Sequence, residues 1–105
     1  QAGGFSIHVG STGCGEGSLT MPPASPCKRS NRVPVGFVRF DPARDVVSVD
    51  LAELMKGTDA TRNTPDTAPG CMSAPDDPEC RGVFAAFGLP WADNPAGPHR
   101  AFRKN

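Results

Sequence analysis

The first regular pattern of apolar and polar residues lies between Phe5 and Val9. Phe5, Ile7 and Val9 fall on one face of an extended chain, whereas Ser6 and His8 fall on the other. A period of two residues is typical of a half-buried strand. We therefore predict a strand here, with His8 on the face turned away from the core.

Two later segments carry the β-branched and aromatic residues that favour strands. In Val33–Phe40, Gly36 indicates a bulge and Pro34 an edge position, so we predict a bent edge strand. In Val46–Leu51 the apolar residues alternate, which predicts a second strand. Ala101-Phe102 is a candidate closing strand.

Helix signals occur twice in the second half of the sequence. Asp50 opens a capping-box pattern, which predicts a short helix at Leu51–Lys56 before Gly57. Asp77 and Pro78 are typical of the cap and first position of a second helix. The apolar face of that helix and its terminating glycine follow at helical spacing: Cys80, Val83, Phe84, Phe87 and Gly88.

The remaining segments are predicted loops, because glycine, proline and small polar residues dominate them. Gly10–Pro26 and Thr58–Ala74 are the longest. A chain of 105 residues holds one core, so residues 1–105 form a single domain or a portion of one. The predicted fold class is mainly β, a β-sandwich or partial sandwich with long disulfide-tied loops and one or two short helices.

Four cysteines in a short chain with only 37% hydrophobic residues indicate two disulfides. Their spacing does not fit the C-x₂₋₄-C pairs of structural zinc sites or the C-x-x-C of redox proteins. The sequential pairing, Cys14–Cys27 and Cys71–Cys80, is favoured because each pair brackets a proline-rich turn. Disulfides in turn indicate an exported protein.

Composition and charge exclude several functions. Eleven Lys and Arg balance eleven Asp and Glu, so no basic surface is available for nucleic acid. No apolar run approaches the length of a membrane span. With two histidines and no recognisable catalytic triad, the sequence does not favour an enzyme.

His8 is the first candidate for metal binding, because an imidazole on a rigid strand suits a transition metal. The alternative is an ordinary surface histidine, and we expect His99 to be a solvated loop residue. Asp76–Glu79 offers oxygens for calcium, although helix capping explains it better. Thioethers for Cu(I) are present, but scattered methionines usually fill gaps in packing: Met21, Met55 and Met72.

Four stretches follow a known pattern: Gly4–Cys14, Phe40–Leu51, Gly70–Cys80 and Phe84–Leu89. The most specific, Gly70–Cys80, reads GCMSAPDDPEC. Together they resemble the C-terminal half of the MbnP-like proteins, the methanobactin-associated, four-cysteine members of metallo-mystery pairs. The four cysteines of this chain look like the four of that family.

The resemblance implies a secreted or periplasmic, β-rich protein that binds one copper ion. Its implied partner is a MauG- or MbnH-like di-haem protein, which oxidises a tryptophan of the copper protein to kynurenine. His8 matches the histidine of the family's Gly-Phe-x-x-His-x-Gly segment and is therefore the implied copper ligand.

The family's Trp-x-Trp motif has no counterpart here, because the chain has one tryptophan, Trp91, which we interpret as an aromatic anchor. The chain is then either a C-terminal portion of a larger MbnP-like β domain or a reduced relative that has lost the site. We expect the portion, because a few half-buried strands alone are marginally stable in water. Further copper ligands, and the cover for exposed strand edges, would come from the N-terminal half or from another chain. The alternative is a disulfide-stabilised extracellular structural or interaction module without metal, with contacts along the first strand and the helix at Pro78–Phe87.

Overall fold

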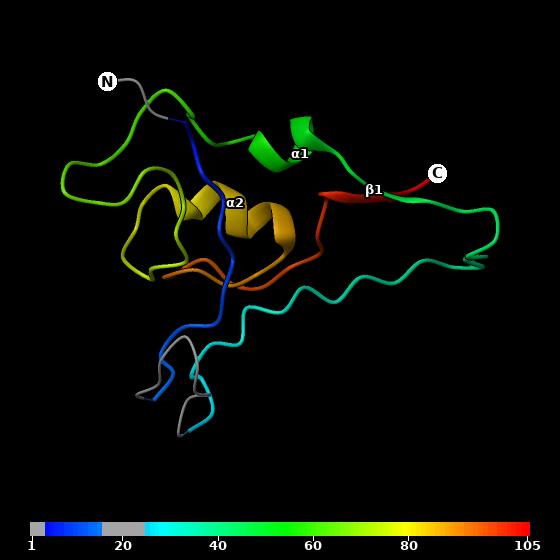
Figure 1. Ribbon diagram of the computed structural model, residues 1–105, viewed down its shortest axis with the longest axis horizontal. Coiled ribbons are helices and arrows are strands. Elements are labelled where there is room, and N and C mark those ends of the chain that lie inside the picture. Colours follow the sequence, from blue (N-terminus) through cyan, green and yellow to red (C-terminus); the bar gives the residue numbers. More distant parts are fainter. Residues whose placement is uncertain (1–3, 16–24) are drawn as a thin grey trace.

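The computed structural model describes residues 4–15 and 25–105. Its regular elements are few and short, and turns and extended segments connect them (Figure 1). In chain order they are β1 (Val47–Val49), α1 (Leu51–Met55), α2 (Cys80–Phe87) and β2 (Phe102–Lys104). The disulfide-rich form with two short helices is as predicted. A β-sandwich is not confirmed, because within residues 4–15 and 25–105 the strands form one two-stranded sheet.

Helix α2 is the centre of the core and confirms the predicted apolar face. Val83 and Phe84 are buried, and the Phe84 side chain is only 1% exposed. Gly88 ends the helix in the left-handed region at φ 72°, as its position predicts. The start differs from the prediction, because Asp77 caps the preceding turn and accepts a hydrogen bond from the Glu79 N–H at 3.2 Å.

Helix α1 begins where the capping pattern predicts. The Asp50 carboxylate accepts a hydrogen bond from the Glu53 N–H at 3.0 Å, which satisfies one of the free donors of the first turn. Leu54 is buried against the core, and α1 packs on α2. The core is completed by side chains from loops and from the two ends of the described chain: Cys71, Leu89, Trp91 and Ala101, with Phe5, Val9 and Val33 packed against it.

The two-stranded sheet pairs β1 and β2 in antiparallel register, with Val47 opposite Lys104 and Val49 opposite Phe102. The predicted strands at these places are confirmed, although they are short and Leu51 belongs to α1. Val47 and Val49 remain about half exposed. The apolar face of β1 is therefore only partly covered by the described residues.

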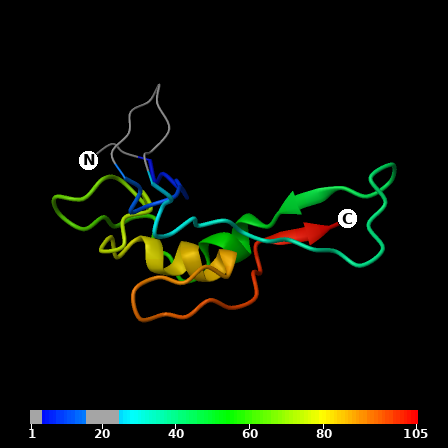
Figure 2. The ribbon, with the colours of Figure 1, turned by 90° about the horizontal axis from the view of Figure 1, so that it is seen from below.

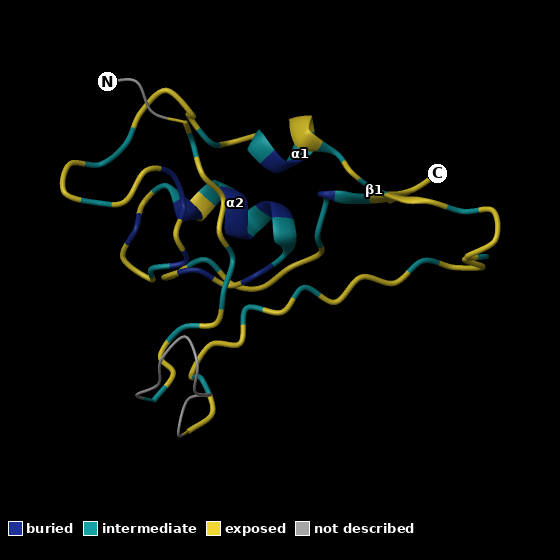
Figure 3. Ribbon diagram, viewed as in Figure 1, coloured by how far each residue is buried: buried dark blue, intermediate teal, exposed yellow. Residues whose placement is uncertain are grey.

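The predicted edge strand at 33–40 is wrong. These residues are extended but make no backbone–backbone hydrogen bond to any other described residue, and Arg39 turns the chain at φ 54°. They lead away from the helices to a turn, and the chain returns as β1 (Figures 1 and 2). We call residues 33–49 the arm. Figure 3 shows its surface as exposed or intermediate, and Val38 is 80% exposed.

The predicted strand at Phe5–Val9 is also too long. The segment is extended, but its only bridge is at Ile7, which pairs in parallel with Cys71. A continuous ladder cannot form because Ser73 turns the partner segment at φ 69°. The single bridge nevertheless fixes where His8 lies.

Candidate metal site around His8

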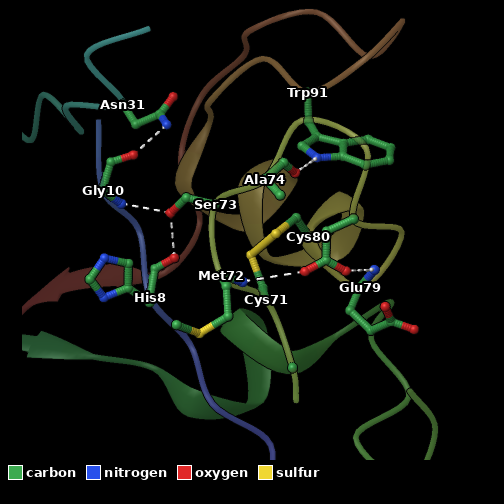
Figure 4. The surroundings of a disulfide bond; sticks show 12 residues. His8, Gly10, Asn31, Cys71, Met72, Ser73, Ala74, Glu79, Cys80 and Trp91 are labelled. Atoms are coloured by element: carbon green, nitrogen blue, oxygen red, sulfur yellow. Dashed lines mark hydrogen bonds between the residues drawn. A yellow bond between two sulfur atoms is a disulfide. The ribbon is translucent and has the colours of Figure 1, made fainter. Parts of the chain in front are cut away.

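His8 lies where the first extended segment meets residues 70–73. Its backbone N–H donates to the Cys71 carbonyl at 2.8 Å, and the Cys71 N–H donates to the Ser6 carbonyl at 2.8 Å. Figure 4 shows His8 beside Cys71, Met72 and Ser73. Gly70 makes this approach possible, because it has φ 78° and a Cβ there would overlap the backbone of Ser6. The His8 backbone is thereby held from one side.

The buried Ser73, two residues beyond Cys71, also holds the backbone around His8. The Ser73 hydroxyl donates to the His8 carbonyl at 2.5 Å and lies 2.7 Å from the Gly10 N–H, which donates to it. The Asn31 amide donates to the Gly10 carbonyl at 2.6 Å. These bonds fix the backbone on both sides of the imidazole, a form of preorganisation that a ligand residue needs.

Two disulfides anchor this region, and both have the predicted sequential pairing. Cys71–Cys80 is fully buried and joins the partner segment of His8 to the first residue of α2. Cys14–Cys27 closes the loop that follows His8, whose residues 16–24 lie outside the described part of the chain. The Cys71–Cys80 disulfide therefore ties the candidate site to the centre of the core.

The His8 side chain itself is exposed. The imidazole lies over Gly10, since a Cβ added at Gly10 would stand 2.9 Å from His8 Nε2. The imidazole is thus exposed on a fixed backbone, and its role as a metal ligand stays a prediction. However, in residues 4–15 and 25–105 no three His, Cys, Asp or Glu side chains gather into a metal cluster.

The acidic stretch Asp76–Glu79 serves the fold. Asp77 is buried, and its carboxylate faces the N–H groups of Met72 and Glu79. Burial and the neighbouring Glu79 raise the pKa of Asp77. Burial also acts to raise the pKa of Glu79, but hydrogen bonds with Asp77 and Thr64 outweigh it and lower that pKa. The Asp77 carboxylate and Glu79 Oε1 accept internal hydrogen bonds, so we assign no calcium site to this stretch.

Trp91 and His99 occupy structural positions. Trp91 is 7% exposed, and its indole N–H donates to the Ala74 carbonyl at 3.3 Å, which fits an aromatic anchor. The expectation that His99 is solvated is wrong. Its ring lies edge-on to Phe37 and Phe102, at centroid distances of 6.5 and 5.6 Å, because the end of the chain returns beside the arm.

Sequence reasoning did not place Met72 and Ser73 at this site. Both stand in the specific stretch Gly70–Cys80, which was the available signal, but nothing local indicates that this stretch pairs with His8. Met55 lies in α1, and Met21 falls outside the described residues. Of the two described methionines, Met72 is the one adjacent to the residues that hold His8.

The fold and site define a small, disulfide-stapled module with one exposed histidine held beside a buried disulfide. The same architecture occurs in MbnP from Methylosinus trichosporium, with a TM-score of 0.77 and 37% sequence identity over 95% of this chain. The chain is thus similar to the MbnP-like proteins, as its motifs indicate. It spans 38% of the length of that MbnP chain. No protein-family model matches the chain, and no curated protein matches it in sequence.

Proposed function

We propose that the chain is the His8-bearing part of an exported, non-enzymatic, copper-binding protein of the MbnP-like kind. The observation that carries this proposal is the His8 geometry: an exposed imidazole whose backbone is fixed by Cys71, Ser73 and Gly70. Similarity to MbnP supplies the class of protein. Because the described residues hold no cluster of three ligands, we propose that further copper ligands come from outside them.

The proposed location is the periplasm or the extracellular space. Two disulfides, one of them fully buried, fit an oxidising compartment, where such bonds form and persist. In the part of the chain that the structure describes, no helix is long and apolar enough to cross a membrane.

The proposed partner is a MauG-type di-haem enzyme that converts a tryptophan of the copper protein to kynurenine. We give Trp91 a structural role instead of this one, because its indole is buried and bonded to Ala74. Incubating the chain with such an enzyme should therefore leave the mass of the Trp91 peptide unchanged. Oxygen added to that peptide would reassign Trp91 as the modified residue.

The copper proposal is tested with His8→Ala and, as the matched control, His99→Gln at the only other histidine. The full chain is titrated with copper against a chromogenic chelator. Loss of a protein ligand should weaken binding about tenfold or more in His8→Ala and leave His99→Gln unchanged. Equal affinity in His8→Ala and the parent would contradict the proposal.

Gly10→Ala is a second variant that acts on the same imidazole without removing it. The added Cβ would stand 2.9 Å from Nε2, so the ring must move. We expect copper affinity between those of the parent and His8→Ala, with an unchanged thermal midpoint. A parent-like copper affinity would mean that the orientation of His8 does not matter.

A second candidate function is a metal-free interaction module, and the arm is the observation that favours it. The expected contact surface along α2 has little apolar area to offer, because four side chains of α2 are buried in the core: Cys80, Val83, Phe84 and Ala86. Most of the exposed large apolar side chains of the described residues lie on and next to the arm: Val35, Val38, Phe40, Val46, Val47, Val49 and Leu51. We propose that their partner is a further β-sheet segment of an MbnP-like domain, since the matched MbnP is much longer than this chain.

A further inference from the structure

We propose that the groove between residues 28–34 and residues 88–97 is a docking surface for an acidic peptide segment of a partner protein. The groove has a volume of about 530 Å³. One wall carries the cationic side chains of Lys28, Arg29 and Arg32, and the opposite wall includes Leu89 and Pro90. Such docking needs no metal and is a function beyond the proposed binding of copper.

The basic wall has a local excess of positive charge, although the net charge of the whole chain is zero. Within residues 4–15 and 25–105, the ion pairs are formed by other cations and none involves Lys28, Arg29 or Arg32. The described lining of the groove contains no Asp or Glu. The three cations are exposed and therefore attract acidic groups from outside the described residues.

The backbone of the basic wall is held in place. The Thr12 N–H donates to the Arg29 carbonyl at 2.8 Å, and the Arg29 N–H donates to the Thr12 carbonyl at 3.0 Å. The Lys28 N–H donates to the Gly13 carbonyl at 3.1 Å. A partner therefore meets a backbone that is already ordered, which lowers the entropic cost of binding.

The opposite wall is mainly apolar and is also fixed. Leu89 and Trp91 are 6% and 7% exposed, and the exposed Pro90 lies between them. The Gly97 N–H donates to the Gly88 carbonyl at 3.1 Å, which closes the loop that carries this wall. The wall suits the apolar side chains of a peptide, whereas a buried indole gives nucleobases no open aromatic face on which to stack.

The basic side chains favour carboxylates as the acidic groups of the ligand. Two of the three cations are arginines, whose planar guanidinium groups bind carboxylates through two parallel hydrogen bonds. A single inorganic anion would leave the apolar wall unused. A peptide that alternates acidic and apolar side chains would use both walls at once.

The first test measures binding of a fluorescein-labelled peptide of alternating glutamate and leucine to the full chain by fluorescence anisotropy. Arg29→Gln/Arg32→Gln should weaken binding about tenfold or more. The matched control, Arg39→Gln/Arg62→Gln, makes the same change of net charge at exposed arginines outside the groove and should bind like the parent. Equal weakening in both double variants would overturn the proposal, because net charge alone would then determine binding.

The second test places a carboxylate of the chain itself in the groove. A Cβ added at Gly97 meets no atom within 4 Å, and the same holds for Gly36 on the arm. Gly97→Glu should therefore keep the thermal midpoint of the parent and weaken peptide binding about tenfold, because the new carboxylate competes for the cations. Gly36→Glu has the same net charge and should bind like the parent. Parent-like peptide affinity in Gly97→Glu would contradict the proposal.

Two further probes distinguish the kind of ligand. A peptide of alternating glutamine and leucine should not bind, and inorganic phosphate at an equal concentration of charge should not displace the glutamate peptide. Binding of the glutamine peptide would show that charge is not recognised, and displacement by phosphate would assign the groove to small anions. Either result would overturn the proposal of an acidic peptide partner.

Discussion

The core around α2 and the arm at residues 33–49 both carry valine and phenylalanine side chains but differ in what surrounds them. In the core, Val83 and Phe84 are buried on all sides, and a buried disulfide adjoins them. On the arm, Val38 and Val46 face solvent. The comparison shows that apolar residues stabilise this protein only where other elements cover them, and that the arm has surface to offer a partner.

The largest expected effect is on the free energy of unfolding, when one side chain in each region is shortened to alanine. Phe84→Ala should lower the free energy of unfolding by about 3–5 kcal/mol, because it leaves a cavity in the core. Val38→Ala should change it by less than about 0.5 kcal/mol, since Val38 is already in solvent. Urea unfolding followed by Trp91 fluorescence measures both. Similar losses of unfolding free energy in the two variants would contradict the distinction between core and arm.

The second prediction concerns the disulfide of the core. The double variant Cys71→Ala/Cys80→Ala should lower the free energy of unfolding by about 2–4 kcal/mol. Loop entropy alone favours a larger effect of Cys14–Cys27, whose sequence separation is 13 compared with 9. We expect the reverse order, because Cys71 and Cys80 are also fully buried. A larger loss in Cys14→Ala/Cys27→Ala would show that loop closure dominates.

A smaller effect is expected at Asp50, where the arm meets α1. The Glu53 N–H and, to a lesser degree, Arg103 lower the pKa of the Asp50 carboxyl. A lowered pKa in the folded state stabilises the fold above the ordinary aspartate pKa, and this stabilisation is lost as the pH falls through the lowered value. The thermal midpoint of Asp50→Ala should thus lie below that of the parent at pH 7, and the two midpoints should converge in acid.

Thermal scans between pH 7 and pH 2 test that prediction. The control is Asp93→Ala, which removes an exposed ion pair with Arg81 instead of a helix cap. Such a pair contributes little. A constant difference between Asp50→Ala and the parent across the whole pH range would mean that the charge of Asp50 is not responsible.

The smallest effect on stability is expected on the arm itself. Val38→Lys/Val46→Lys should leave the free energy of unfolding within about 0.5 kcal/mol of the parent, because both side chains are exposed. The double variant should self-associate less than the parent at high concentration, because its exposed apolar surface is smaller. Light scattering after gel filtration measures this. A loss of more than about 1 kcal/mol in the free energy of unfolding would mean that the arm unfolds together with the core.

The helices and disulfides could be predicted from the sequence because their signals are local. Asp50 caps α1, Gly88 ends α2, and each cysteine pair brackets its own turn. The prediction of an edge strand at 33–40 failed because β-propensity describes a surface that fits beside another strand, and no described strand pairs with this segment.

The candidate site was only half predictable for the same reason. His8 could be singled out from its motif and its place in an alternating segment. Its neighbours could not, because the pairing with Cys71 and the bonds to Ser73 join distant parts of the chain. His99 beside Phe37 is a second contact of this kind, and it overturned the expectation of a solvated residue.

The same pairing also determines when the site forms. Gly10 and its partner Ser73 are 63 positions apart, so the segment carrying His8 is synthesised long before the residues that hold it. Closing so long a loop costs entropy that only the assembled core can offset. A newly made chain therefore lacks the proposed copper site, and under that proposal the metal is acquired after folding and disulfide formation are complete.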